Sequence, residues 1–528
     1  MGTSKLSYYK TRLKGNLSDE ACQKLEFIRE AFTSGQAIQG LEGFLYSLTP
    51  EQVDAVKMSR TSCPVEDRPQ GTLRPYQTVG VAFMYYSQSC LLGDSVGLGK
   101  TAQIAGLYNL LAQFSTSDRP PRVLFFGDRV ATPHLRDELI MFTGEYVHHS
   151  WSTTKSIEDL VMEYAEEPVN LVIPHAALRN QLFQAWFETQ YANTGKFPYD
   201  LVVVDESSVL GNSTTQIYKA SKALFKDCPR LILLNATPFE ADLDTFYNQL
   251  NLLDPTFLPT KTSFNNTYRS MDYSGIFPKF TGRYKNAERF QHLVSLRYLP
   301  RTREQLGASF QDCSADLVLV PLSDEQKALL KDTYLHRAVY DCPWVLDPSI
   351  DTCGKVEATV NLVGEILSTD AKQVLIYSHF KDAQDVLMEA IEFAGYSCHV
   401  LNGDTNDTDS RDIIKSFQSG NTQVLITNVQ KSLNFDNVNH CIFYGYNPNP
   451  NKMRQFEGRI TRSFDVRDKH IYMILTEGKE FETFKHTVLS RADASKDFAG
   501  SDFSMVITLL SQQISSMEEP PSTLDLDC

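Results

Sequence analysis

The stretch Gly93-Asp94-Ser95-Val96-Gly97-Leu98-Gly99-Lys100-Thr101 decides the fold that we predict for this chain. It follows the apolar run 90–92 and precedes an amphipathic run, 102–114, whose apolar residues recur at helical spacing. A strand, a glycine-rich turn and a helix form a phosphate-binding loop, because backbone N–H groups converge at the N-terminus of the helix. In such a loop Gly97 and Gly99 shape the backbone, Lys100 reaches the β- and γ-phosphates and Thr101 binds Mg²⁺. The strict pattern has glycine where this chain has Asp94.

Short runs of Val, Ile and Leu recur on both sides of this loop and alternate with helical stretches. Runs that are apolar on both faces, separated by helices, are typical of a buried parallel sheet in an α/β domain. A polar and aromatic segment, 256–315, interrupts the rhythm and carries Arg297, Arg301 and Arg303. We therefore predict two α/β units, with strands at 90–92, 123–126, 171–173, 201–204 and 231–234 in the first, and at 374–378, 398–401, 424–427, 441–444 and 471–475 in the second.

Length and composition agree with this organisation. A chain of 528 residues allows roughly three or four domains, and 42% hydrophobic with 22% charged residues is the ordinary globular range. No apolar run reaches ten residues, so we expect no transmembrane helix, and the N-terminus lacks the pattern of a signal peptide. The ten cysteines are scattered, which favours free thiols in a reducing compartment. We expect an intracellular protein, cytoplasmic or associated with the nucleoid, and not a secreted one.

The net charge of −15 excludes a basic footprint over the whole chain but leaves room for a locally basic groove. The basic segment 1–18 is interpreted either as an arm that touches phosphates or as a solvated terminus. The acidic tail from about 516 is predicted to be disordered. It docks on a basic protein partner, occupies the chain's own groove when nucleic acid is absent, or only aids solubility.

A second chemical signal is Asp205-Glu206, directly after the apolar run 201–204. Acidic residues at the carboxyl end of a buried strand lie where α/β sheets bind ligands. In a phosphate-loop NTPase, Asp205 holds the Mg²⁺ shell and Glu206 orients the attacking water. The alternative is that the pair only begins a loop or caps a helix.

A third signal is Gln455-Phe456-Glu457-Gly458-Arg459-Ile460-Thr461-Arg462. Arg459 and Arg462 are three residues apart and share one face of a helix. A solvated basic helix is the plain alternative. We favour arginines that neutralise γ-phosphate charge, because this unit has no phosphate loop and the first unit has no obvious arginine finger.

Together these stretches resemble the superfamily-two helicases and translocases and, within them, the Swi/Snf-like DNA-dependent ATPases, over about 71–485. The resemblance implies two tandem RecA-like parallel-sheet lobes with ATP and Mg²⁺ between them, and nucleic acid across both. It implies an α/β chain with a helical N-terminal extension and a helical insertion between the lobes. The implied domains are 1–70 (extension), 71–255 (first lobe), 256–315 (insertion), 316–490 (second lobe) and 491–528 (C-terminal segment).

The same resemblance implies roles for single residues. The match at 73–80 makes Arg74 and Gln77 part of the adenine site, and Asp94 is the residue that this family carries at the start of its phosphate loop. Gln455 belongs with the two arginines. The stretches 123–139 and 171–178 fall where the first lobe contacts the nucleic-acid backbone. Residues that couple nucleic acid to the nucleotide site are Thr237, Ser378, Thr427 and Asn428.

Three departures from the family pattern stand out. Ser207-Ser208 replaces the usual Ala-His after Asp205-Glu206, Asn235 stands in an uncommon position before Ala236-Thr237-Pro238, and Gln430-Lys431-Ser432 stands where glycines are usual. The segment 246–255 looks specifically Swi/Snf-like.

We predict an ATP-dependent DNA helicase or translocase that acts in repair, recombination or replication, on duplex or branched DNA. The absence of any recognisable chromatin-reading module, zinc site or nuclease motif favours a compact viral or bacterial motor, in the host cytoplasm if viral. The alternatives are an RNA helicase of the same superfamily and a non-catalytic scaffold with decayed motifs.

Overall fold

The computed structural model forms two compact units, residues 1–308 with 494–502 and residues 309–493 with 503–528, and each is described by itself. The residues that the structure describes are 17–33, 73–114, 119–129, 131–236, 238, 243–272, 274, 279–302, 313–332, 336–369, 371–428, 435, 438–447, 453, 456, 457, 460, 469–485, 510, 513 and 514. Residues 1–16 of the basic segment 1–18 and the acidic tail from about 516 lie outside them.

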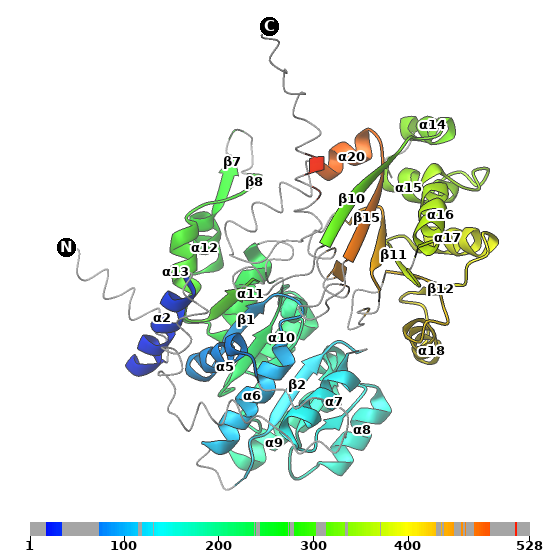
Figure 1. The fold of residues 1–528 in the computed structure, drawn as a ribbon. Helices are drawn as coiled ribbons and strands as arrows, with labels where there is room; N and C mark the ends of the chain where they lie inside the picture. The colour runs from blue at the N-terminus through cyan, green and yellow to red at the C-terminus, as the bar shows by residue number, and fades with distance from the viewer. Residues whose placement is uncertain are drawn as a thin grey trace. The chain divides into compact units, whose positions relative to one another are not determined.

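The first unit is built on a parallel sheet in the order β3-β4-β2-β5-β6-β1-β9. Figure 1 labels its strands β1 and β2. Side chains alternate between its two faces: Val202 and Val204 enter the core on one side, and Leu201 and Val203 the core on the other. The prediction that these apolar runs are strands buried on both faces is therefore confirmed. The strands are β1 (Cys90–Asp94), β2 (Val123–Gly127), β3 (His148–His149), β4 (Leu171–Pro174), β5 (Leu201–Val204), β6 (Leu231–Leu234) and β9 (Tyr298–Arg301).

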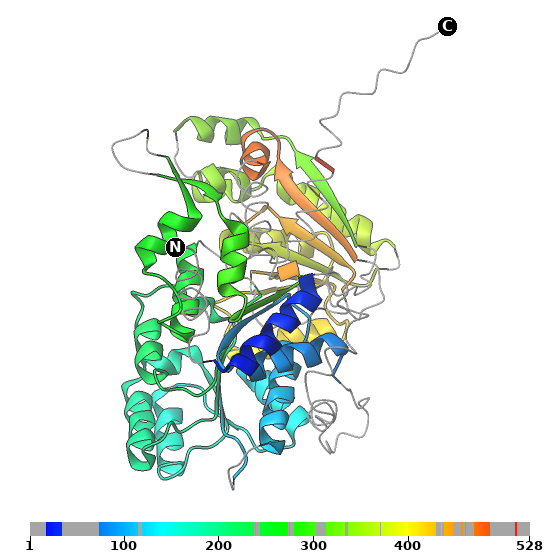
Figure 2. The ribbon, with the colours of Figure 1, turned by 90° about the vertical axis from the view of Figure 1, so that its left-hand side faces the viewer.

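Helices cover both faces of this sheet (Figures 1 and 2). One core includes residues of α2 (Asp19–Thr33), α5 (Pro75–Ser87), α6 (Lys100–Gln113) and α7 (Thr132–Thr143). The opposite core includes residues of α8 (Thr154–Glu163), η1 (His175–Arg179), α9 (Gln181–Thr194), η2 (Ser207–Leu210), α10 (Gln216–Leu224) and α11 (Leu243–Leu253). Helix α2 packs on α5 through Ala21 and Leu25, so the described part of the predicted N-terminal extension belongs to the first unit's core.

The predicted insertion, 256–315, is more than a helical segment. It contains α12 (Lys261–Tyr268) and α13 (Ala287–Val294), but also the antiparallel pair β7 (Arg269–Asp272) and β8 (Lys279–Tyr284) and the edge strand β9. Buried arginines fix β9: Arg297 donates to the Ser87 carbonyl at 2.5 Å and to Asp254 at 3.4 Å, and burial lowers the pKa of Arg297. The boundary expected at 255 is thus too early, because the first sheet takes an edge strand from beyond it.

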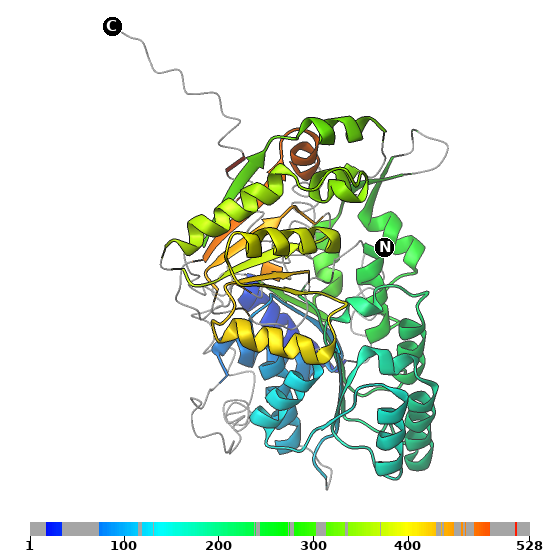
Figure 3. The same ribbon diagram turned by 90° about the vertical axis from the view of Figure 1, so that its right-hand side faces the viewer.

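The second unit has a parallel sheet in the order β10-β15-β14-β11-β13-β12. Its faces again carry separate cores, with Leu375 and Tyr377 on one side and Val374 and Ile376 on the other. Helices α16 (Gly354–Leu367) and α17 (Lys381–Phe393) cover the second of these faces (Figure 3). The strands are β10 (Cys313–Val320), β11 (Val374–Ser378), β12 (Cys398–Leu401), β13 (Val424–Thr427), β14 (His440–Tyr444) and β15 (Lys469–Thr476).

Further helices among the described residues of this unit are α14 (Asp324–Asp332), α15 (His336–Asp341), η4 (Pro343–Val345), α18 (Asp407–Gln418) and α20 (Lys479–Thr483). The prediction of two parallel-sheet α/β units is confirmed. Among the described residues no helix has the length and apolar character needed to cross a membrane. The described cysteines are free thiols, and most of them are buried.

Candidate functional site

Three neighbouring strands of the first sheet carry the predicted chemical residues at their carboxyl ends. Strand β6 lies between β5 and β1, and register pairs Leu234 with Leu92 on one side and Leu233 with Val204 on the other. The segment after β5 begins with Asp205, and the phosphate loop follows β1. Because the strands are parallel, these segments emerge at one edge of the sheet, where such folds bind ligands.

The phosphate loop has the backbone that its glycines were expected to allow. Gly97 and Gly99 adopt left-handed conformations, with φ of 83° and 70°. Gly99 is the N-cap of α6, and no side chain caps this helix. The Lys100 ammonium donates to the Asp94 carbonyl at 2.9 Å and lies 3.4 Å from that of Ser95. A long helix whose N-terminus has no side-chain cap, with a lysine folded over the loop, fits a phosphate group.

Gln77 braces this loop from α5. Its side-chain oxygen accepts the Arg74 N–H at 2.8 Å, and its amide nitrogen donates to the Leu98 carbonyl at 3.1 Å. The Tyr76 hydroxyl donates to the same carbonyl at 3.1 Å. A Cβ at Gly99 would collide with the Gln77 amide, so this contact also requires glycine. Gln77 is buried and Arg74 is exposed, so the structure places the predicted adenine pair at the start of α5 against the loop.

Asp94 is not a ligand-facing residue, and our assignment of it to the cofactor site is wrong. Its carboxylate is fully buried and is held by Arg301 of β9, whose Nε donates to Oδ1 at 2.6 Å and whose Nη2 donates to Oδ2 at 2.5 Å. Gln103 of α6 donates to Oδ2 at 2.8 Å and accepts from Arg301 at 2.7 Å. Arg301 also donates to the Tyr76 carbonyl. Asp94 therefore anchors the first residue of the loop to the sheet edge.

Two further contacts tie the loop to Arg301. The backbone N–H and the hydroxyl of Ser95 both donate to the Arg301 carbonyl, at 3.1 and 3.2 Å. A Cβ at Gly80 would collide with Gln103 and with the guanidinium, so α5 approaches this closely because position 80 has no side chain. Sequence reasoning singled out Arg301 only as part of an arginine cluster at the end of the insertion, and it missed Gln103.

The segment after β5 holds its acidic residues in an unusual backbone. Glu206 is left-handed, with φ of 45° and ψ of 52°, a conformation that is rare for a residue with a side chain. Asp205 is fixed on both sides, because its N–H donates to Phe126 at 2.8 Å and its carbonyl lies 2.8 Å from Nε2 of His175. His175 falls in the stretch expected to contact nucleic acid, but it is buried against this turn.

The second sheet brings together some of the residues predicted to couple nucleic acid. Ser378 ends β11 and Thr427 ends the adjacent strand β13, where it pairs with Tyr377. Both side chains are fully buried, and the Ser378 hydroxyl donates to Phe380 at 3.2 Å. Their coupling role stays a prediction, and burial of both hydroxyls argues for a role through the backbone or through neighbouring residues. Asn428, directly after β13, is half-buried.

Four predicted residues, Thr237, Gln455, Arg459 and Arg462, lie outside the described residues, so their roles stay predictions from the sequence. Their described neighbours Met453, Phe456 and Ile460 are fully buried in one core of the second unit.

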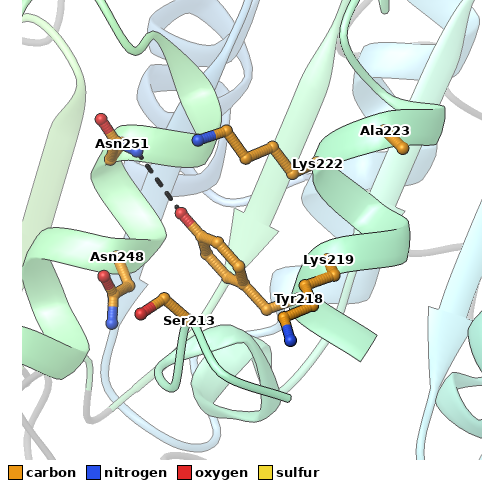
Figure 4. Close-up of a pocket in the computed structure, with 7 residues that line it drawn as sticks. All are labelled: Ser213, Tyr218, Lys219, Lys222, Ala223, Asn248 and Asn251. Atoms are coloured by element: carbon orange, nitrogen blue, oxygen red, sulfur yellow. Dashed lines mark hydrogen bonds between the residues drawn. The ribbon is translucent and has the colours of Figure 1, made fainter. Parts of the chain in front are cut away.

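A pocket of about 520 Å³ lies elsewhere on the first unit, between α10 and α11, and most of the residues that line it are polar (Figure 4). Tyr218 is placed between the two helices, and its hydroxyl accepts from Asn251 at 3.4 Å. Lys219 and Lys222 are exposed at its rim. The pocket contains none of the predicted catalytic or binding residues, although Asn248 and Asn251 belong to the Swi/Snf-like segment 246–255. Its lining residues are Ser213, Tyr218, Lys219, Lys222, Ala223, Asn248 and Asn251.

Comparison with known proteins adds to this geometry. A family model described as SNF2-related domain matches residues 76–359, more than half of the chain. The chain belongs to the SNF2-related family. A second model, described as helicase conserved C-terminal domain, matches residues 354–463. The predicted resemblance to the Swi/Snf-like members of superfamily two, with two RecA-like lobes, is confirmed.

Relatives of this SNF2-related chain share low identity with it. DNA repair and recombination protein RAD54B of Gallus gallus is 22% identical over 527 residues, covering 81% of this chain and 54% of the relative. DNA repair and recombination protein RAD54 of Oryza sativa subsp. japonica is 24% identical over 513 residues, covering 80% and 51%. The chain spans about half the length of these curated relatives.

Among solved structures, the Sulfolobus solfataricus SWI2/SNF2 ATPase core in complex with dsDNA aligns at 18% identity with a TM-score of 0.37. The alignment covers 84% of this chain and 96% of that one. The assignment to the family rests on the family models and on the chain's own sheets, and not on this similarity.

Proposed function

We propose that this SNF2-related chain hydrolyses ATP and uses the energy to move along DNA in repair or recombination. The observation that carries the proposal is the phosphate loop at the N-terminus of α6, which is braced by Gln77 and by the buried Asp94–Arg301 pair. A loop held by buried contacts is preorganised, so the donors for phosphate need no rearrangement during the reaction.

The residues present fit a nucleotide with its metal. The loop backbone and Lys100 would hold the phosphates, and Thr101 and Asp205 offer the oxygen ligands that Mg²⁺ prefers. Mg²⁺, when bound, neutralises charge on the phosphates. Glu206, in its left-handed turn, would align the water, and Gln77 would meet the base. Arg459 and Arg462 are proposed from the sequence alone as further positive charges.

DNA is the nucleic acid that we propose. Two relatives are named as DNA repair and recombination proteins, which favours DNA over the RNA alternative. The pocket between α10 and α11 adds a local basic feature to a chain of net charge −15, because Lys219 and Lys222 reach it from one helix. We propose that its lysines and amide groups contact the DNA backbone, which is the partner that such groups bind without reading sequence.

The deciding experiment is the ATPase rate of the parent chain with duplex, single-stranded, forked and four-way DNA, and with RNA. Stimulation by DNA and not by RNA supports the proposal. Lys100→Ala should remove hydrolysis while the chain stays folded, and Glu206→Gln should retain ATP binding and lose turnover. A parent chain that binds a fluorescent ATP analogue but never hydrolyses ATP would favour the scaffold alternative.

The pocket has its own test. Lys219→Ala with Lys222→Ala should weaken DNA affinity and lower the slope of log affinity against log salt by about 2, one for each lost phosphate contact. The matched control is Lys155→Ala with Lys196→Ala, which removes two exposed lysines of the same unit that lie outside the pocket. Equal salt slopes for the two double variants would rule out the pocket as a DNA contact.

A further inference from the structure

Two departures from the family pattern meet at one side chain. Ser207 stands in place of the usual Ala after Asp205-Glu206, and Asn235 stands in an uncommon position before the segment 236–238. In the structure both donate to the same oxygen of Gln249 on α11, Ser207 at 2.7 Å and Asn235 at 3.1 Å. Gln249 is fully buried, as is Ser207, and Asn235 is nearly so.

The contacts of Gln249 fix the orientation of its amide. Its oxygen accepts from Ser207 and Asn235, while its nitrogen donates to the carbonyls of Pro238 and Thr245, each at 3.2 Å. A flipped amide would set its nitrogen against the Asn235 amide group and its oxygen against two carbonyls. Gln249 therefore acts as an oriented bridge, and buried polar networks of this kind hold one arrangement when every member is satisfied.

The bridge joins two segments that the proposed reaction uses. Ser207 directly follows Glu206, whose left-handed backbone needs support from its surroundings. Pro238 belongs to the segment that follows β6, the strand between β5 and β1. The oxygen of the Gln249 amide thus holds Ser207, next to the proposed water-orienting Glu206. The nitrogen of the same amide holds Pro238, after the neighbouring strand β6.

We propose that Gln249 is a positioning residue that couples the Glu206 turn to Asn235 and Pro238 after β6, so that the two move together when nucleic acid stimulates the reaction. The inference deepens the proposed function and rests on it. In this chain Ser207 and Asn235 both donate to Gln249, which completes the connection.

The test compares two buried glutamines. Gln249→Met removes the bridge at similar side-chain volume. Gln190→Met is the matched control, because Gln190 of α9 is also buried and also donates to two carbonyls, those of Tyr164 and Ala165, away from the phosphate loop. We expect Gln249→Met to bind the ATP analogue within about threefold of the parent and to lose at least about tenfold in DNA-stimulated kcat. Gln190→Met should keep both values within about twofold, even where its thermal stability falls equally.

Equal stimulation of the Gln249→Met variant and the parent would overturn the coupling role. Should Gln249→Met not fold, Ser207→Ala removes one hydrogen bond alone, and parent-like stimulation in that variant would overturn the role too. A parent chain without ATPase activity would overturn the proposed function instead. Amide hydrogen exchange then tests the Gln249 contacts without any need for ATPase activity. Gln249→Met should speed exchange at 207–210, and unchanged exchange there contradicts the proposal.

Discussion

Both units bury a charged network, and the two networks do different work. In the first unit the carboxylate of Asp94 pairs with Arg301, and both side chains are fully buried. In the second unit Lys355 pairs with Asp341 and lies 3.2 Å from Glu480, again with almost no exposure. Glu480 also accepts from the Thr476 N–H at 2.7 Å.

The difference lies in what each network is attached to. Asp94 and its neighbour Ser95 belong to the phosphate loop, so the first network fixes the backbone that we propose binds nucleotide. The second network joins α15, α16, α20 and the end of β15, and it includes none of the predicted site residues. Similar chemistry therefore supports the proposed nucleotide site in one unit and ties helices and a strand together in the other.

Removing Lys355 should give the largest loss of stability. Lys355→Met leaves two buried carboxylates without a cation, and the free energy of unfolding of the second unit should fall by about 5 kcal/mol. Fluorescence of Trp344, in a background with Trp151→Phe and Trp186→Phe, reports on this unit alone. Affinity for the ATP analogue should not change. A clear loss of affinity would contradict the claim that only the first network supports the nucleotide site.

Removing Arg301 should cost somewhat less stability and should also damage the site. Arg301→Met leaves one buried carboxylate, so we expect a loss of about 3–4 kcal/mol in the first unit. The phosphate loop loses its anchor at Asp94, and affinity for the ATP analogue should fall at least about tenfold. Titration of the variant with the ATP analogue, under conditions where the variant stays folded, measures this affinity. Parent-like affinity would mean that the Asp94–Arg301 pair is only structural.

Neutralising both partners should separate the two effects. In Asp94→Asn with Arg301→Met no buried charge is left unpaired, and the loss of stability should shrink to about 1–2 kcal/mol. The guanidinium that holds the loop is still missing, so nucleotide affinity should stay low. Recovery of affinity together with stability would show that the unpaired charge, and not the lost anchor, disturbs the loop.

Alkaline pH should produce the smallest effect. Burial by itself lowers the pKa of Lys355, but Asp341 and Glu480 together raise it to about 12, above the ordinary 10.5. The stabilisation from the ammonium is thus complete below pH 10.5 and is lost as the pH rises through about 12. The free-energy gap between the parent and Lys355→Met should narrow by on the order of 2 kcal/mol over this window, as followed by urea unfolding. A constant gap would contradict the raised pKa.

Ten strands were predictable because each is a short apolar run that is mostly buried on both faces of a parallel sheet, and such burial leaves a direct trace in composition. The missed strands lack that trace. Strand β10 is half-exposed along most of its length, and β9 contains Pro300 and Arg301 within four residues. A proline and a charged residue argue against a strand in sequence, whereas here Arg301 is satisfied by a distant carboxylate.

The sequence by itself determined the phosphate loop, because Gly97, Gly99 and Lys100 act through local backbone geometry and short-range reach. It also determined that acidic residues end a buried strand. Only the tertiary structure decided what Asp94 does, since its partner Arg301 lies 207 residues away. The same holds for Gln249, whose bridge depends on α11 packing beside η2. A buried polar group must find a partner, and the fold alone selects which distant residue that partner is.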